Sequence, residues 1–142
     1  MEQTMNDLIS TKIDFLKEMG ADKTPHRDKT LLEHLIGVSE ILKEMNAPEY
    51  IQDAGLFHSI YGTAYFRHQT VSDRQVVQDL IGEKAELLAY LFCVLGRVTD
   101  RQSEITAIED KRVRDDLMLI DFANSEEQSR GREMTLEDAY NV

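Results

Sequence analysis

Three residues of this 142-residue chain have the types and surroundings from which a metal site could be built. His34 and His58 each share the apolar stripe of a predicted helix, so both imidazoles are expected to point inward and to converge. A neutral imidazole is a common ligand of zinc, iron and manganese. Asp121 lies in the apolar run "LMLIDFAN", where an unpaired buried carboxylate would be costly. These residues predict a site for a divalent metal.

Each of these residues also has a simpler interpretation. A single inward histidine is more often a packing residue whose hydrogen bond is satisfied within the core. Asp121 could instead form a salt bridge with Arg97 or Arg114. His68 is either a replacement ligand or a residue of a surface loop, and the sequence assigns no role to His26.

Helical periodicity predicts the elements that would position these residues. Apolar residues recur at helical spacing, and the helices are separated by glycine, proline or polar segments. The predicted helices cover residues 5–19, 31–45, 48–59, 72–82, 83–96 and 103–128, the last with a break near Asp110. No segment alternates with a period of two, so no sheet is expected. The segment 83–96 is apolar on nearly all sides, which is typical of a central buried helix.

Composition limits the class of protein. A chain of this length with 42% hydrophobic residues is expected to form one domain over residues 1–142, with a tail, 129–142, that is frayed or docks as a short helix. A soluble protein is expected, because the sequence has neither a signal-like start nor a long apolar stretch. Cys93 is the only cysteine, so no internal disulfide can form, and a reducing, cytoplasmic location is expected.

The net charge of −11 limits the class of partner. It repels phosphate backbones and anionic lipid, so neither nucleic acid nor a membrane is an expected partner. A small phosphorylated molecule needs only a few lysines or arginines, and a small-molecule ligand is therefore expected. The apolar segment 87–95 suits either a monomer or the core of a homodimer.

Three motifs, in order, resemble the HD-domain superfamily of metal-dependent phosphohydrolases. They are "LLEHLIGVSEIL", "AGLFHSIYGT" and "LMLIDFAN". They are most similar to the hydrolase domain of the RelA/SpoT alarmone enzymes, which carries H-x-x-x-V-x-E-I-L, A-x-L-L-H-D-x-x-E-D-T and a late A-D-x-x-x-N. His58 follows His34 by 24 positions and Asp121 follows His58 by 63, separations of the order found in that group. The resemblance covers about residues 28–128, and "AGLFHSIYGT" is also similar to a motif of a group of small bacterial proteins.

The resemblance implies a single-domain HD-like helical bundle of about six helices. In such a bundle His34, His58 and Asp121 would hold manganese, iron or zinc and leave coordination positions open. Ser59 stands where the family has its second metal-binding aspartate. Because a serine hydroxyl is a neutral and weaker ligand, the affinity for a hard divalent ion is expected to fall.

The water-activating pair of the alarmone hydrolases also differs in this chain. Residues 60–63, "IYGT", replace the Glu-Asp pair and are one residue shorter. Ser59, Tyr61 or Glu33 would then have to orient the attacking water, although an aromatic residue such as Tyr61 is more often a packing residue.

Three functions are compatible with these residues. The first is a metal-dependent hydrolase acting on a small phosphorylated molecule, in which the ion lowers the pKa of a bound water. The second is a non-catalytic HD-like domain that binds a ligand or a partner, which the substitution at Ser59 favours. The third is an iron-dependent oxygenase, which would need more histidines and acids than the motifs supply.

Overall fold

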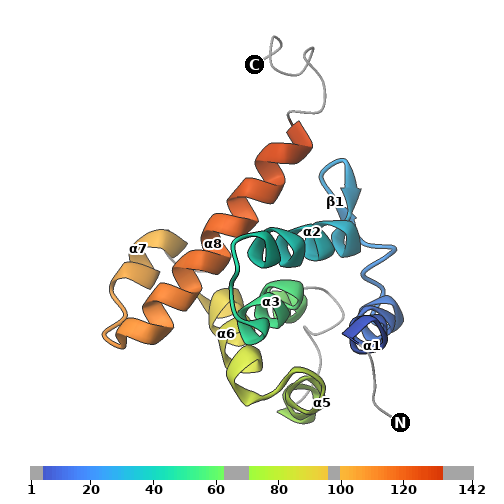
Figure 1. Cartoon of the computed structure of the whole chain (residues 1–142), viewed down its shortest axis with the longest axis horizontal. Helices are drawn as coiled ribbons and strands as arrows, with labels where there is room; N and C mark the ends of the chain where they lie inside the picture. Colours follow the sequence, from blue (N-terminus) through green and yellow to red (C-terminus); the bar gives the residue numbers. More distant parts are fainter. Residues whose placement is uncertain (1–4, 63–70, 96–99, 133–142) are drawn as a thin grey trace.

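The computed structural model describes residues 5–62, 71–95 and 100–132, which are mostly helical (Figure 1). Seven α-helices lie in these ranges, which confirms the predicted all-α fold. They are α1 (Met5–Glu18), α2 (Leu31–Glu44), α3 (Glu49–Leu56), α5 (Val71–Ile81), α6 (Glu83–Val94), α7 (Arg101–Thr106) and α8 (Lys111–Arg132). A 3-10 turn, η1 (Ile60–Gly62), follows α3. No helix in the described part of the chain is long and apolar enough to cross a membrane.

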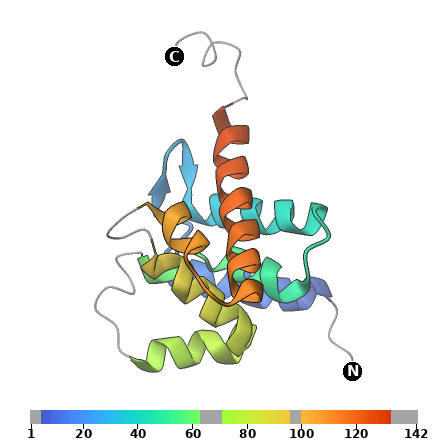
Figure 2. The same cartoon turned by 90° about the vertical axis from the view of Figure 1, so that its left-hand side faces the viewer.

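The central helix is α2, rather than α6 as the apolar segment 83–96 predicts. It packs most extensively against α3 and α8, and α8 crosses it and continues beyond the body of the molecule (Figure 2). Helix α6 packs against α3 and α5 through one face, while Leu87 on its other face is exposed. The prediction, from its apolar composition, that this helix is central and buried is therefore wrong.

Local signals set the ends of α2. Thr30 accepts a hydrogen bond from the backbone N–H of Glu33, and the Glu33 carboxylate accepts one from the backbone N–H of Thr30. This capping box satisfies two donors that the first turn leaves unpaired. At the other end Asn46 adopts a left-handed φ of 61°, and the Ala47 N–H returns to the Leu42 carbonyl, which ends the helix.

A short hairpin precedes α2, although the sequence predicted no sheet. Its strands, β1 (Pro25–His26) and β2 (Lys29–Thr30), pair antiparallel, and Arg27 at the turn has a left-handed φ of 58°. Strands of two residues are too short to show an alternating pattern, so periodicity could not reveal them. The hairpin lies beside the projecting half of α8 (Figures 1 and 2).

A close approach of α2 and α3 positions His58. A β-carbon at Gly55 would fall well inside van der Waals contact with the Leu42 side chain, so the two helices can meet at this spacing only with glycine there. Helix α3 ends at Leu56, earlier than the predicted Ser59, and His58 lies in the turn that follows. The turn faces α2 at the level of His34.

The remaining boundaries agree with the sequence signals in part. Asp110 accepts a hydrogen bond from the Val113 N–H at the start of α8, so the predicted break near Asp110 is present. Residues 129–132 of the predicted tail continue α8. His68, Arg97 and residues 133–142 lie outside the described residues.

Candidate functional site: a histidine pocket

A pocket of about 440 Å³ opens between the hairpin, α2, the turn after α3, α6, α7 and α8. We call it the histidine pocket because three of the four histidines line it. The lining residues are Thr24, Pro25, His26, Leu31, His34, His58, Ser59, Phe92, Cys93, Arg101, Asn124 and Gln128. No aspartate or glutamate is among them.

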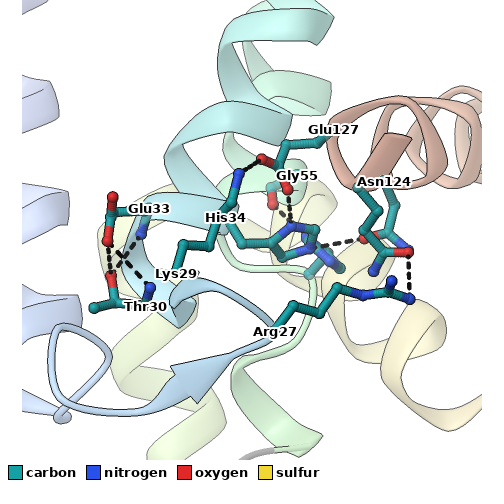
Figure 3. Close-up of polar contacts among 10 residues, drawn as sticks. Arg27, Lys29, Thr30, Glu33, His34, Gly55, Asn124 and Glu127 are labelled. Atoms are coloured by element: carbon teal, nitrogen blue, oxygen red, sulfur yellow. Dashed lines mark hydrogen bonds and ion pairs between the residues drawn. The ribbon is translucent and has the colours of Figure 1, made fainter. Parts of the chain in front are cut away.

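His34 is held at both ring nitrogens by residues of α8 (Figure 3). Its side chain is 1% exposed, Nδ1 contacts Glu127 Oε1, and Nε2 lies 2.8 Å from Asn124 Oδ1. A carboxylate only accepts hydrogen bonds, so Nδ1 carries a proton. Nε2 faces the Asn124 amide, whose oxygen can accept and whose N–H₂ can donate after a half turn of the amide group.

Glu127 lies behind His34 and is shared with the hairpin. Lys29 Nζ donates to Glu127 Oε2, and His34 donates to Oε1. Burial alone would raise the pKa of Glu127, but the hydrogen bonds from Lys29 and His34 outweigh it and hold the pKa below its ordinary value. Gly37 makes room for this carboxylate, since a β-carbon there would lie 2.7 Å from Glu127 Cγ.

His58 is buried and neutral. Its side chain is 3% exposed, and Nδ1–H donates to the Gly55 carbonyl over 2.7 Å. Burial is the main cause that lowers the pKa of His58 to about 3, so Nε2 carries a lone pair at neutral pH. The ring meets His34 edge to face at 5.2 Å, and the Asn124 side chain interacts with it as well.

Asp121, the predicted carboxylate ligand, is directed elsewhere. It is partly exposed, and burial raises its pKa while Arg101 lowers it and Asp100 raises it. Its electrostatic neighbours among the described residues therefore lie on and before α7, and the hydrogen bonds of His34 and His58 go to other residues. Asn124, one turn further along α8, reaches His34 instead.

Sequence reasoning missed Asn124 and Glu127, although a signal was present. Leu117 and Ile120 are fully buried and mark the inward face of α8. Steps of four and three residues from Ile120 continue this face to Asn124 and Glu127. Attention to the acid inside the apolar run selected Asp121, which lies beside that face.

The three predicted water-orienting residues are dispersed. Ser59 lines the histidine pocket. Tyr61 donates its hydroxyl to Glu86 over 2.7 Å, and burial followed by Glu86 raises its pKa strongly. Glu33 is exposed and belongs to the capping box of α2. Of the three, only Ser59 is placed to touch a molecule in the pocket.

The donor set does not fit a hard divalent metal. The groups at the meeting point of the two rings are two imidazoles and the amide of Asn124, and the carboxylate of Glu127 contacts the other ring nitrogen of His34. Within the described ranges, no group of three or more His, Cys, Asp or Glu residues is arranged to hold a metal ion. Manganese and related ions prefer anionic oxygen ligands, which this arrangement lacks.

Two buried polar atoms of the pocket have no hydrogen-bond partner among the described residues. They are Ser59 Oγ and His26 Nε2. The His26 ring stacks on His34 at 4.1 Å, and burial followed by the nearby His34 lowers its pKa. Buried polar atoms are normally paired, so these two are available for a bound molecule.

Arg101 gives the pocket a fixed positive charge. Its guanidinium lies 4.2 Å above the Phe92 ring, and its Nε donates to the carbonyls of Phe92 and Leu95. These bonds hold the side chain in place at the pocket wall, and they use only Nε of the three guanidinium nitrogens.

A family model described as "Domain of unknown function (DUF6817)" matches residues 15–97 of the chain. The match includes the hairpin, α2, His34 and the His58–Ser59 turn, and it ends before α8 supplies Asn124 and Glu127. No curated protein and no solved structure matches the chain.

Proposed function

The chain belongs to the family described as "Domain of unknown function (DUF6817)", and we propose that it binds a small anionic molecule in the histidine pocket without a metal ion. The observation that carries this proposal is the pairing of an acid-free lining with two unpartnered polar atoms, Ser59 Oγ and His26 Nε2. A phosphate or carboxylate oxygen would accept from the serine hydroxyl, from the Nε2–H of His26 and from Arg101.

Local charge supports an anionic ligand although the whole chain carries −11. Arg101 contributes one positive charge at the wall. Glu127 lies behind His34, and Lys29 and His34 both bind it, so its charge is compensated locally. Asp121 lies near Arg101 but is not part of the lining. An anion in the pocket therefore meets donors at short range and feels the net charge mainly at long range, where salt screens it.

Metal-dependent hydrolysis is the second candidate, and one observation favours it. Both histidines donate their Nδ1–H to an acceptor, Glu127 for His34 and the Gly55 carbonyl for His58. Metal-binding histidines are commonly oriented in this way, with Nε2 left for the ion. The amide at Asn124 and the hydroxyl at Ser59 weigh against it, because both are neutral.

Two reciprocal substitutions separate the candidates. Asn124→Asp places a carboxylate between the two rings, and Asp121→Asn removes the acid one turn away. Under the proposal, Asn124→Asp weakens binding of inorganic phosphate about tenfold or more by charge repulsion and creates affinity for zinc or manganese. Asp121→Asn leaves phosphate affinity within about twofold, because its side chain is not part of the pocket lining.

Isothermal titration calorimetry measures the affinities of the wild type and of both variants for phosphate, zinc and manganese. Micromolar metal binding by the wild type that Asp121→Asn abolishes would reject the anion-binding proposal and support the hydrolase. Circular dichroism confirms that each variant is folded before titration.

A further inference from the structure

A second, smaller hollow of about 180 Å³ lies next to the histidine pocket. Arg27 at the tip of the hairpin and three residues of α8, Ser125, Gln128 and Ser129, line it, and we call it the hairpin subsite. Gln128 lines both the hairpin subsite and the histidine pocket, so one molecule can reach from one into the other.

The side chains of the hairpin subsite are all donors to an anion. Ser125, Gln128 and Ser129 are three and four positions apart and so share one face of α8. They offer two hydroxyls and an amide, and Arg27 adds a guanidinium, the group best shaped for phosphate oxygens. Glu126, the acid between them in sequence, lies 3.8 Å from Arg130 and is not part of the lining.

Arg27 occupies a backbone position that does not suit it. Its φ of 58° is left-handed, a conformation that costs a residue with a β-carbon about 1 kcal/mol and that favours glycine or asparagine. Among the described residues its side chain hydrogen-bonds only Gln128, with Nη2 3.5 Å from Oε1, the limit of a hydrogen bond (Figure 3). The turn would be at least as stable with glycine, so contacts within the chain do not explain an arginine here.

We propose that the hairpin subsite binds a second anionic group of the ligand. This inference rests on the proposed function, and it narrows the ligand class to small molecules with two anionic groups, at least one of them a phosphate. One group lies in the histidine pocket near Arg101 and Ser59, and the other lies on Arg27 and the two serines of α8.

Alkyl monophosphates and α,ω-alkanediol bisphosphates with chains of three to six carbons are suitable probes, because they differ only in the second phosphate. The wild type is expected to bind the best bisphosphate with a Kd at least about tenfold lower than that of its monophosphate, because the second phosphate adds charge-assisted hydrogen bonds. Arg27→Gln should abolish this difference and leave the monophosphate affinity unchanged. Arg130→Gln is the matched control, since it removes the same charge from an exposed site outside the lining and should preserve the difference.

The outcomes separate the two proposals. If the monophosphate binds but the bisphosphate binds no tighter, or if Arg27→Gln and Arg130→Gln reduce the difference equally, the hairpin subsite is rejected and the histidine pocket stands. If neither probe binds the wild type, the proposed function fails and the subsite fails with it. Arg27→Gly adds a check on folding, since it should lose the bisphosphate preference while the melting temperature stays equal or rises.

Discussion

His58 is the clearest case of a residue whose surroundings fix its chemical state. Its Nδ1–H is bound to the Gly55 carbonyl, and burial depresses its pKa to about 3, so the ring stays neutral throughout the physiological range. It therefore contributes shape and a lone pair to the pocket, and positive charge has to come from Arg101. This division fits binding of an anion by donors placed around a neutral, rigid floor.

The state of His58 predicts an acid-dependent loss of stability. The pKa of His58 is lowered in the native protein. Below pH 6.5 the histidine of the unfolded chain therefore binds a proton, whereas the native one does not until the pH approaches 3. Stability should therefore fall as the pH falls from about 6.5 toward 3, by about 1.4 kcal/mol per pH unit from this residue. Urea unfolding at several pH values measures the slope.

A variant isolates the contribution of His58 to that slope. His58→Gln should remove most of the slope between pH 6.5 and 5 while lowering stability at pH 7. His26→Gln is the comparison, because His26 is only partly buried and should contribute less. An unchanged slope in His58→Gln would mean that the ring is already protonated in the native protein.

At the scale of elements, two glycines let helices approach closely enough to bring the site together. Gly55 brings α3 against α2, and Gly37 leaves room for Glu127 from α8. These contacts place the turn with His58 on one side of His34 and the polar face of α8 on the other. Small residues in the core of the bundle thus determine distances in the pocket.

Gly55→Ala is expected to destabilise the protein by about 1–3 kcal/mol, because the new methyl group overlaps Leu42 and forces α3 away from α2. The same shift should weaken phosphate binding, since His58 and Ser59 follow α3 directly. Chemical denaturation and phosphate titration measure the two effects.

Gly82→Ala is the matched control for Gly55→Ala. Nothing lies within 4 Å of a β-carbon at Gly82, and the cost there comes only from the backbone, whose φ of 90° and ψ of 157° suit glycine alone and cost other residues about 1–3 kcal/mol. Phosphate affinity should not change. Equal effects of both alanines on affinity would show that the α2–α3 spacing does not control the pocket.

The sequence predicted the helices well because their apolar periodicity and their end signals are local. Gly20, with φ 86°, follows the first predicted helix, and Asp110 lies at the predicted break, where it caps α8. The partners of His34 were not predictable in the same way, since Glu127 is 93 positions away and its approach depends on how α8 crosses α2. The hairpin was missed because four paired residues leave no periodic pattern.

At the scale of the whole molecule, the charge of the chain and the charge of its two pocket linings have opposite signs. The chain carries 27 acidic against 16 basic residues, yet the lining of the histidine pocket and of the hairpin subsite contains arginines and no acid. The hairpin contributes Arg27 and α7 contributes Arg101, while the residues of the His58 turn and of α8 in the two linings are uncharged. We therefore expect the protein to bind a small anion selectively although its net charge is negative.

Titration of the chelator-treated wild-type protein with inorganic phosphate, followed through the NMR signals of the histidine rings, tests the central claim most directly. Metal-free protein should show saturable shifts of the His26 and His34 ring signals, with His58 remaining in its neutral form. Ring signals that respond to phosphate only after zinc or manganese has been added would contradict metal-free anion binding.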